Sequence, residues 1–261
     1  MMFIDTHAHL MDESFEGDLE QVKERAKEAG VSIVINVGCG CDFSQKAVEM
    51  VDVEKGFYAT VALHPYDAED FSEELMDEWE KVCRENVGVV AIGETGLDYV
   101  KSEVDREKQK ESFRGHLQLA RKVGLPVIVH NRGADSDCLE ILREFDGSDG
   151  EARVEAVFHC FASDLSFAKK VWEAGYYTSF TGIITFKNAV ELQEVVREAP
   201  MGLIMTETDC PYLAPGPYRG KRNEPAYVVE VVKKIVELKG LSEENVAAVV
   251  MDNAKRFFGL S

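Results

Sequence analysis

Two histidines one residue apart, His7 and His9, follow a short apolar run near the start of the chain. Successive side chains of a β-strand point to opposite faces, so these two imidazoles share a face and can bind one metal ion. A His-x-His pair is a weak signal by itself, because surface strands also carry alternating polar residues. It gains weight because five of the six histidines lie at the ends of apolar runs.

Later apolar runs end in a histidine or a carboxylate in the same way. A charged group beside an apolar run is costly to bury unless it is paired or bound to a metal ion. His116 provides the contrast, because it lies inside a helical pattern and is expected to be structural. The side chains at the ends of the later runs are those of His64, Glu94, His130, His159 and Asp209.

The hydrophobic pattern predicts eight strands alternating with helices. This is the size and rhythm of an α/β protein with a single-domain (β/α)₈ TIM barrel over residues 1–261. A doubly wound open sheet is the alternative, but no glycine-rich turn follows the first strand. The predicted strands are residues 3–6, 32–38, 57–63, 87–93, 125–129, 155–158, 176–180 and 203–206. The predicted helices include residues 18–29, 73–85, 107–123, 164–174, 189–198, 226–239 and 242–258.

Barrel active sites lie at the carboxyl ends of the strands, so the candidate ligands are expected to converge. Four histidines and two carboxylates exceed the three protein ligands of a typical catalytic zinc, which indicates two divalent ions. Glu94 is well placed to bridge them, and Glu207 either contacts the site or supports it. The donors suit Zn²⁺, Mn²⁺ or Fe²⁺ better than Mg²⁺ alone, and the choice of ion stays open. The predicted ligands are His7, His9, Glu94, His130, His159 and Asp209.

The segment after the last predicted strand, residues 211–225, has three basic residues within four positions. Asn223 is expected to cap the next helix, so backbone N–H groups would also face this loop. Barrels frequently bind phosphate here, and Arg132 adds positive charge. The alternative is a solvated, proline-braced surface loop. Tyr212 and Tyr218 are candidates for stacking on bases, with packing against the barrel as the alternative for at least one.

Composition narrows the classes of protein. With 45% apolar residues the chain can bury a large core, and it has neither an apolar signal segment nor a membrane span, so a cytoplasmic protein is expected. The net charge of −19 argues against nonspecific coating of nucleic acid or anionic membranes, although it leaves an anionic substrate possible at a local site. The six cysteines are expected to be free thiols.

Together these motifs resemble the TatD-type metal-dependent deoxyribonucleases, a branch of the amidohydrolase-like barrel hydrolases. The resemblance extends over nearly the whole chain. Three departures from the family pattern are present, Ala162-Ser163 after HCF, Ala62 before LHP and Met201-Gly202 before the last predicted strand, and none changes a ligand. The matching motifs are DTHAHL at 5–10, LHP at 63–65, GETGLDY at 93–99, LPVIVHNR at 125–132, HCF at 159–161, TFKNA at 185–189, ETDCPYLAP at 207–215, RGKRNEP at 219–225 and NAKRFFGL at 253–260.

The resemblance implies hydrolysis of phosphodiester bonds in DNA, commonly as a 3′-end exonuclease acting on short single-stranded ends, with no obligate protein partner. One ion is then expected on His7, His9 and Asp209, the other on His130 and His159, and Glu94 bridges them. His64, Arg132, Arg222 and Asn223 are expected to contact substrate phosphate.

A hypothesis for the reaction follows, with Asp209, Glu94 and His64 as catalytic residues. A metal-held hydroxide attacks phosphorus, Asp209 takes the proton of the water, and the ions stabilise the attacking and leaving oxygens. The alternative is a barrel metallohydrolase of an amide, lactone or aminoacyl ester, because the same nucleophile attacks carbonyls. A non-catalytic scaffold is a third possibility, but it predicts a broken ligand set, and none of the expected ligands is missing.

Overall fold

Eight strands alternate with helices along the chain, as the hydrophobic pattern predicts. The computed structural model describes residues 1–147 and 150–260. The strands follow one another in the order β1 to β8, without the reversal of order that defines a doubly wound sheet. They are β1 (Phe3–Ala8), β2 (Val31–Asn36), β3 (Phe57–Val61), β4 (Val89–Asp98), β5 (Val127–Arg132), β6 (Ala156–Phe158), β7 (Tyr177–Phe180) and β8 (Ile204–Thr206).

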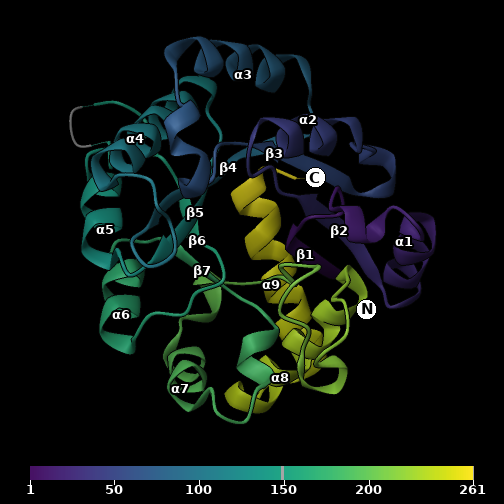
Figure 1. Ribbon diagram of the computed structural model, residues 1–261. Helices are drawn as coiled ribbons and strands as arrows, with labels where there is room; N and C mark the ends of the chain where they lie inside the picture. The colour runs from purple at the N-terminus through teal and green to yellow at the C-terminus, as the bar shows by residue number, and fades with distance from the viewer. Residues whose placement is uncertain (148–149, 261) are drawn as a thin grey trace. The chain divides into compact units, whose positions relative to one another are not determined.

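The helices between the strands match the predicted ranges, and two more, α2 and α5, are present (Figure 1). Both are only nine residues long and neither has a side-chain N-cap, so the start signals of a helix are weak there. No helix among the described residues is both long and apolar enough to cross a membrane. The helices are α1 (Leu19–Glu28), α2 (Cys41–Glu49), α3 (Glu73–Glu85), α4 (Arg106–Val123), α5 (Asp135–Arg143), α6 (Leu165–Glu173), α7 (Val190–Glu198), α8 (Val228–Lys239) and α9 (Glu243–Phe258).

Local signals in the sequence explain where two of these helices end or begin. Ser242 accepts a hydrogen bond from the backbone N–H of Asn245 at 3.2 Å and so caps the start of α9. Gly124 ends α4 in the left-handed conformation, with φ of 73°, which glycine adopts without steric cost. The predicted cap of α8 by Asn223 is wrong, because α8 starts after Tyr227 and has no side-chain cap.

The chain forms two compact units. Unit 1 consists of residues 1–36, 52–57 and 160–260. Unit 2 consists of residues 37–51 and 58–159, with residues 148–149 outside the described part. A single domain over the whole chain therefore stays a prediction.

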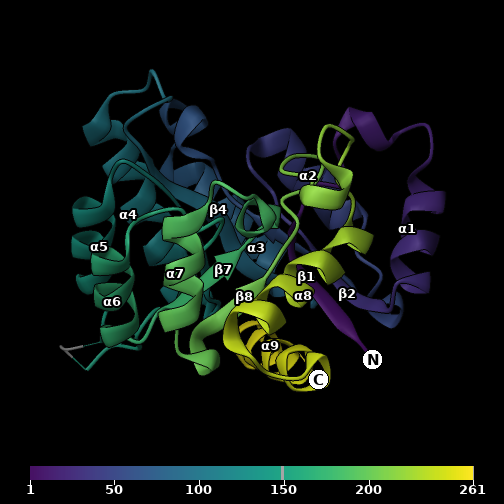
Figure 2. The same ribbon diagram turned by 90° about the horizontal axis from the view of Figure 1, so that it is seen from below.

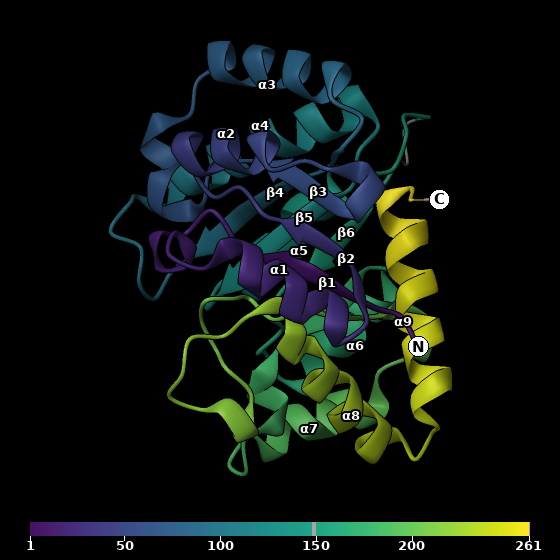
Figure 3. The same ribbon diagram turned by 90° about the vertical axis from the view of Figure 1, so that its right-hand side faces the viewer.

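In unit 1 the first and last strands of the chain are neighbours. β1 pairs in parallel with β2, and Ala8 at the end of β1 forms a parallel bridge with Cys210 after β8. Helix α9 packs against both β1 and β8, and the start of β1 lies beside this helix (Figures 2 and 3). Adjacent first and last strands are what a closed barrel requires of its sheet.

In unit 2 the strands β3, β4, β5 and β6 pair in parallel in that order. Helix α4 packs on β4, and α3 packs on α4 (Figures 1 and 3). All ten residues of β4 are buried, as expected for a strand of a sheet that is covered by helices.

Two strands of unit 2 are longer than predicted. The sequence predicts strand ends near residues 93 and 129, but β4 extends to Asp98 and β5 to Arg132. The polar residues there stay in the ladder, where Gly96 is opposite His130 and Asp98 is opposite Arg132. Glu94 and His130 therefore project from rigid strands rather than from loops.

Candidate metal centre

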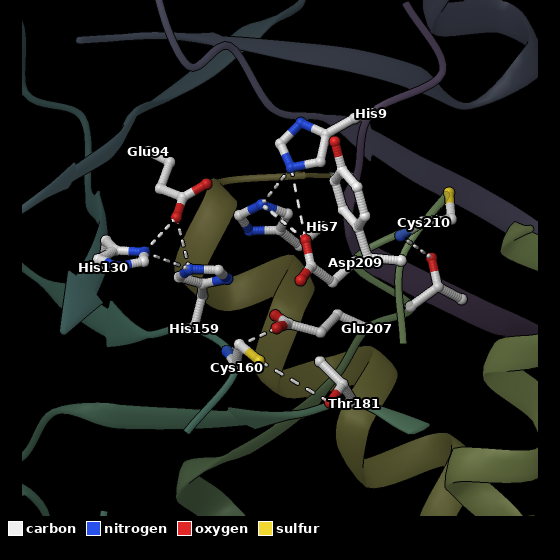
Figure 4. A network of polar contacts seen from close by, with 12 residues as sticks. His7, His9, Glu94, His130, His159, Cys160, Thr181, Glu207, Asp209 and Cys210 are labelled. Atoms are coloured by element: carbon white, nitrogen blue, oxygen red, sulfur yellow. Dashed lines mark hydrogen bonds and ion pairs between the residues drawn. The ribbon is translucent and has the colours of Figure 1, made fainter. Parts of the chain in front are cut away.

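Three potential metal ligands of unit 1 lie together, and we call His7, His9 and Asp209 the unit 1 cluster (Figure 4). The Nε2 atoms of His7 and His9 are 3.1 Å apart. Asp209 Oδ1 lies 3.4 Å from His9 Nε2 and 3.8 Å from His7 Nε2. Both imidazoles are buried, and the Asp209 side chain is 15% exposed, so the cluster opens toward solvent on the carboxylate side.

The backbone of unit 1 fixes this cluster. Asp209 donates its N–H to the His7 carbonyl, and His9 donates its N–H to the Cys210 carbonyl, each at 2.9 Å. Asn223 is fully buried, and its amide donates to the Thr208 carbonyl at 2.8 Å. The carboxyl ends of β1 and β8 are thus tied together at the residues that carry the ligands.

A buried carboxyl group, Asp5, braces the same region. It accepts hydrogen bonds from the hydroxyl and the backbone N–H of Thr208, at 2.5 and 2.8 Å, and from the N–H of His7 at 3.3 Å. Burial raises the pKa of Asp5 to about 8, against the opposing effect of these bonds. Asp5 therefore links the residue before Asp209 to the His7 backbone.

The unit 1 cluster fits a small divalent cation. Ligand atoms about 2.1 Å from a tetrahedral ion lie about 3.4 Å from one another. The three separations of 3.1, 3.4 and 3.8 Å bracket that value. Two imidazoles and one carboxylate are donors that Zn²⁺ and Mn²⁺ accept, and three protein ligands leave a position for water or substrate.

The second cluster, in unit 2, consists of His64, Glu94, His130 and His159, of which Figure 4 shows the last three. Glu94 is its centre, with Oε1 at 2.6 Å from His130 Nδ1, 2.7 Å from His159 Nε2 and 3.4 Å from His64 Nε2. The ring nitrogens of His64 and His159 lie 3.3 and 3.4 Å from His130 Nδ1. We call these four residues the unit 2 cluster.

The electrostatics of the unit 2 cluster favour an ionised Glu94. Burial disfavours its charged form, but the imidazoles of His159 and His64 and hydrogen bonds from His130 and His159 outweigh burial. The pKa of Glu94 is therefore held well below its usual range. An ionised carboxylate among imidazoles fits a divalent cation of the same class as the unit 1 cluster.

His64 lies as close to Glu94 as a ligand would. Its sequence context predicts a contact to substrate phosphate. In the structure, however, the potential ligand atoms of His64, Glu94 and His130 all lie within 4.8 Å of one another. Its Nδ1 accepts the N–H of Tyr66 at 3.2 Å, which orients the ring with Nε2 toward Glu94. The geometry therefore allows His64 to bind either an ion or a phosphate bound beside it.

The other predicted phosphate contacts differ in their surroundings. Arg132 is 42% exposed and lies 3.4 Å from Asp98, so its remaining donors reach solvent next to His130. Both terminal nitrogens of Arg222 instead bind Asp18, at 2.7 and 2.8 Å, and its guanidinium covers the ring of Phe15. Asn223 uses its amide on the carbonyls of Thr208 and Tyr212. A phosphate contact of each of these residues stays a prediction.

Glu207 has a supporting position in unit 1. It is buried, and its Oε1 accepts the backbone N–H of Cys160 at 2.6 Å (Figure 4). Cys160 has a φ of 42°, a conformation that is uncommon for a non-glycine residue. Glu207 therefore stabilises the turn at Cys160.

Sequence reasoning did not single out Asp98, which the structure places against His130. Asp98 Oδ2 lies 3.1 Å from His130 Nε2, on the side of the ring opposite Glu94. A signal was present, because Asp98 follows Glu94 by four residues on one strand and the period of two places both on the same face. The predicted strand ends at residue 93, so this alternation of Glu94 and Asp98 was not recognised as part of a strand.

A barrel sheet whose strands carry two imidazole–carboxylate clusters near their carboxyl ends defines a class of protein, the metal-dependent hydrolases. The family model described as TatD related DNase matches residues 4–259. The chain is 43% identical to the uncharacterized metal-dependent hydrolase YabD of Bacillus subtilis over 260 residues, covering 100% of both proteins. It is 38% identical to the uncharacterized metal-dependent hydrolase YcfH of Escherichia coli K12, covering 99% of this chain and 96% of that protein.

Similar solved structures include members of the same family. The TatD homologue YjjV from Escherichia coli K12 has a TM-score of 0.91 at 28% identity, covering 99% of this chain and 98% of that chain. A TatD family hydrolase from Entamoeba histolytica has a TM-score of 0.87 at 25% identity, covering 100% and 99%. The chain belongs to the TatD family of metal-dependent hydrolases. Its predicted (β/α)₈ TIM-barrel fold is confirmed.

Proposed function

We propose that this hydrolase cleaves phosphodiester bonds in DNA and removes nucleotides from the 3′ end of single strands. The observation that carries the proposal is the pair of ligand clusters, each with imidazoles and a carboxylate at ligand spacing, in a chain whose family is described as a DNase. Two divalent ions, one for each cluster, are part of the proposal. A shared role of Glu94 for both ions stays a prediction.

The donor sets decide what a bound ion would contribute. Divalent ions at such sites lower the pKa of water and neutralise charge on phosphoryl oxygens. His7, His9 and Asp209 would hold one ion, and Glu94, His130 and His159 the other. This chemistry would promote the hydrolysis of carbonyl and of phosphate substrates alike. The choice between the two substrate classes therefore rests on the groups around the clusters.

Two of these groups favour a phosphate. Arg132 presents partly exposed guanidinium N–H groups beside the unit 2 cluster, and such a planar fork matches phosphate oxygens. His64 is also partly accessible, with a side chain 12% exposed, and its Nε2 faces the cluster. We propose that Arg132 and His64 donate to non-bridging phosphate oxygens, where developing negative charge needs stabilisation.

Asp209 is the proposed proton acceptor. Its side chain is 15% exposed, against 6% for Glu94, so water reaches Asp209 more readily. Its Oδ1 lies next to both imidazoles of the unit 1 cluster, which hold the carboxylate in place. We propose that Asp209 takes the proton of the attacking water, in the manner of a general base.

The charge of the chain fits a substrate that is engaged locally. With 48 acidic and 29 basic residues, the protein repels long stretches of nucleic acid. A short strand end that reaches the clusters meets few of those charges. This favours an enzyme that acts at ends over one that binds along a duplex.

The test is a panel of substrates with protein that has been stripped of metal by EDTA and reconstituted with Zn²⁺, Mn²⁺ or Mg²⁺. The panel contains single-stranded DNA, single-stranded RNA, an aminoacyl ester, a lactone and a dipeptide. We expect metal-dependent cleavage of DNA and no comparable turnover of the carbonyl substrates. Cleavage of a carbonyl substrate alone, by protein loaded with metal, would overturn the proposal and favour a metal-dependent esterase or amidase.

A further inference from the structure

Asp98 is at the centre of a hydrogen-bonded group behind His130. Its Oδ1 accepts the backbone N–H groups of Val100 and Lys101, at 2.9 and 2.8 Å. Its Oδ2 faces His130 Nε2 at 3.1 Å, and the Asp98 side chain has no exposed surface. The two oxygens of this carboxylate therefore have different tasks, one for the backbone and one for the imidazole.

Two partly exposed side chains also converge on Oδ2. The hydroxyl of Tyr66 lies 3.2 Å away and the guanidinium of Arg132 lies 3.4 Å away. Both are donors, as are the two backbone N–H groups, so the surroundings stabilise an ionised carboxylate. An ionised carboxylate only accepts hydrogen bonds, so the ring nitrogen opposite it must carry the proton.

We infer that Asp98 is a positioning residue: when an ion replaces the Nδ1 proton that faces Glu94, Asp98 keeps the remaining proton of His130 on Nε2 and directs the Nδ1 lone pair into the unit 2 cluster. Nδ1 is the atom that faces Glu94, at 2.6 Å, and it also lies near the ring nitrogens of His64 and His159. A histidine that binds a metal ion through one nitrogen needs the other held by an acceptor, which fixes both its tautomer and its ring orientation. This inference rests on the proposed metal role of the unit 2 cluster.

The variant Asp98→Asn isolates this role. The side-chain oxygen of asparagine can still accept from Val100 and Lys101, and a flipped amide would place its NH₂ against those two N–H donors. The NH₂ group therefore replaces Oδ2 and faces His130 Nε2 as a donor. The ring must then accept at Nε2, and its proton moves to Nδ1, where it blocks the ligand position.

A matched control lies on α5. Asp137 accepts the hydroxyl of Tyr99 at 2.6 Å and pairs with Lys110 at 2.8 Å, so it has a tyrosine and a cation as partners, as Asp98 has. Neither of these two partners belongs to a ligand cluster. Asp137→Asn makes the same change of a carboxylate to an amide without changing the partner of His130.

The first readout is zinc affinity, measured by competition with a chelator on the folded parent and both variants. We expect Asp98→Asn to weaken the binding of one ion by about tenfold or more, as for other partners of ligating histidines, and Asp137→Asn to leave both ions unchanged. Parental affinity in a folded Asp98→Asn protein would overturn the inference.

The second readout needs no variant, so it decides the question even when Asp98→Asn fails to fold. Nitrogen-15 NMR of the histidine side chains in the zinc-loaded parent should show His130 protonated at Nε2 and coordinated at Nδ1. Coordination through Nε2 would overturn the role of Asp98 and leave the metal role of the cluster intact. A His130 that does not respond to zinc would overturn the proposed metal role and this inference with it.

Discussion

The Nε2 atoms of His7 and His9 lie 3.1 Å apart, with Asp209 Oδ1 within 3.8 Å of both. Two imidazole nitrogens this close, beside a carboxylate and largely buried, form a geometry that a cation stabilises. The strand period explains how two residues of one segment supply both nitrogens.

Loss of one imidazole should therefore remove one bound ion. We expect the parent protein to retain two equivalents of zinc after dialysis and His9→Gln to retain about one, because the unit 1 cluster then has two donors left. Elemental analysis of the dialysed protein measures this. His116→Gln is the control. His116 lies in α4 and belongs to neither cluster, so this variant is expected to retain both equivalents of zinc. Two equivalents retained by His9→Gln would contradict the assignment.

Acid should destabilise the protein through His116. Its Nε2 accepts the N–H of Leu63 at 3.0 Å and its Nδ1 lies 2.7 Å from the Ser112 carbonyl, so the buried ring is neutral. Burial lowers the pKa of His116 from 6.5 to about 4. A lowered pKa means that the unfolded chain binds the proton first as pH falls. This contribution to stability is therefore complete above about pH 6.5 and declines toward pH 4, by up to about 3 kcal/mol.

Urea unfolding at a series of pH values tests the role of His116. The parent should lose more stability between pH 6.5 and 4 than His116→Gln does, whatever the stability of the variant at neutral pH. Equal losses in the two proteins would contradict the lowered pKa.

Gly96 should be intolerant of a side chain. It has a φ of 140°, and a Cβ there would lie 2.1 Å from the backbone oxygen of His130. We expect Gly96→Ala to destabilise the fold by about 3 kcal/mol or more, because neither backbone can move without disturbing the pairing of β4 and β5. Gly17→Ala is the control, since nothing lies within 4 Å of its Cβ position. Thermal unfolding of both variants measures the difference, and equal melting temperatures would contradict this packing.

Tyr212 should affect the binding of substrate. Its side chain is 57% exposed and its ring lies 6.4 Å from that of His9, which suits stacking on a terminal base. Tyr218 instead stacks on Tyr227 at 3.7 Å within the protein. Given the proposed DNase activity, we expect Tyr212→Ala to raise KM for single-stranded DNA about tenfold, with kcat changed less, and Tyr212→Phe to restore it.

Tyr218→Ala serves as the comparison in the same kinetic assay. Its ring already packs on another aromatic ring, so its loss should change KM for DNA less than the loss of Tyr212 does. A larger effect for Tyr218 would place base stacking elsewhere on this loop.

The sequence was sufficient to predict the fold, and the metal ligands that it indicates stay a prediction. Alternation of apolar runs with helical periods predicts the barrel, and short runs ending in His or carboxylate residues predict which side chains gather. His7 and His9 are linked by local strand geometry, so their proximity follows from spacing alone.

Contacts over long sequence separations were not predictable in this way. Arg222 and Asn223 looked available for an anion, yet one pairs with Asp18 and the other ties the backbone at Thr208 and Tyr212. The position of Asp98 beside His130 was not predicted, because the polar residues around it are typical of a loop. Its place in β4 is fixed by pairing with β5, where its partner Arg132 is 34 residues away in the sequence.

The most direct test of the proposed function is the hydrolysis of single-stranded DNA labelled at either end by metal-reconstituted protein. We predict stepwise loss of nucleotides from the 3′ end, abolished by EDTA and by Glu94→Gln, and unaffected by Glu111→Gln, which changes an exposed carboxylate on α4. Undiminished cleavage by a folded Glu94→Gln protein, or no cleavage by parent protein that holds two ions, would contradict the account.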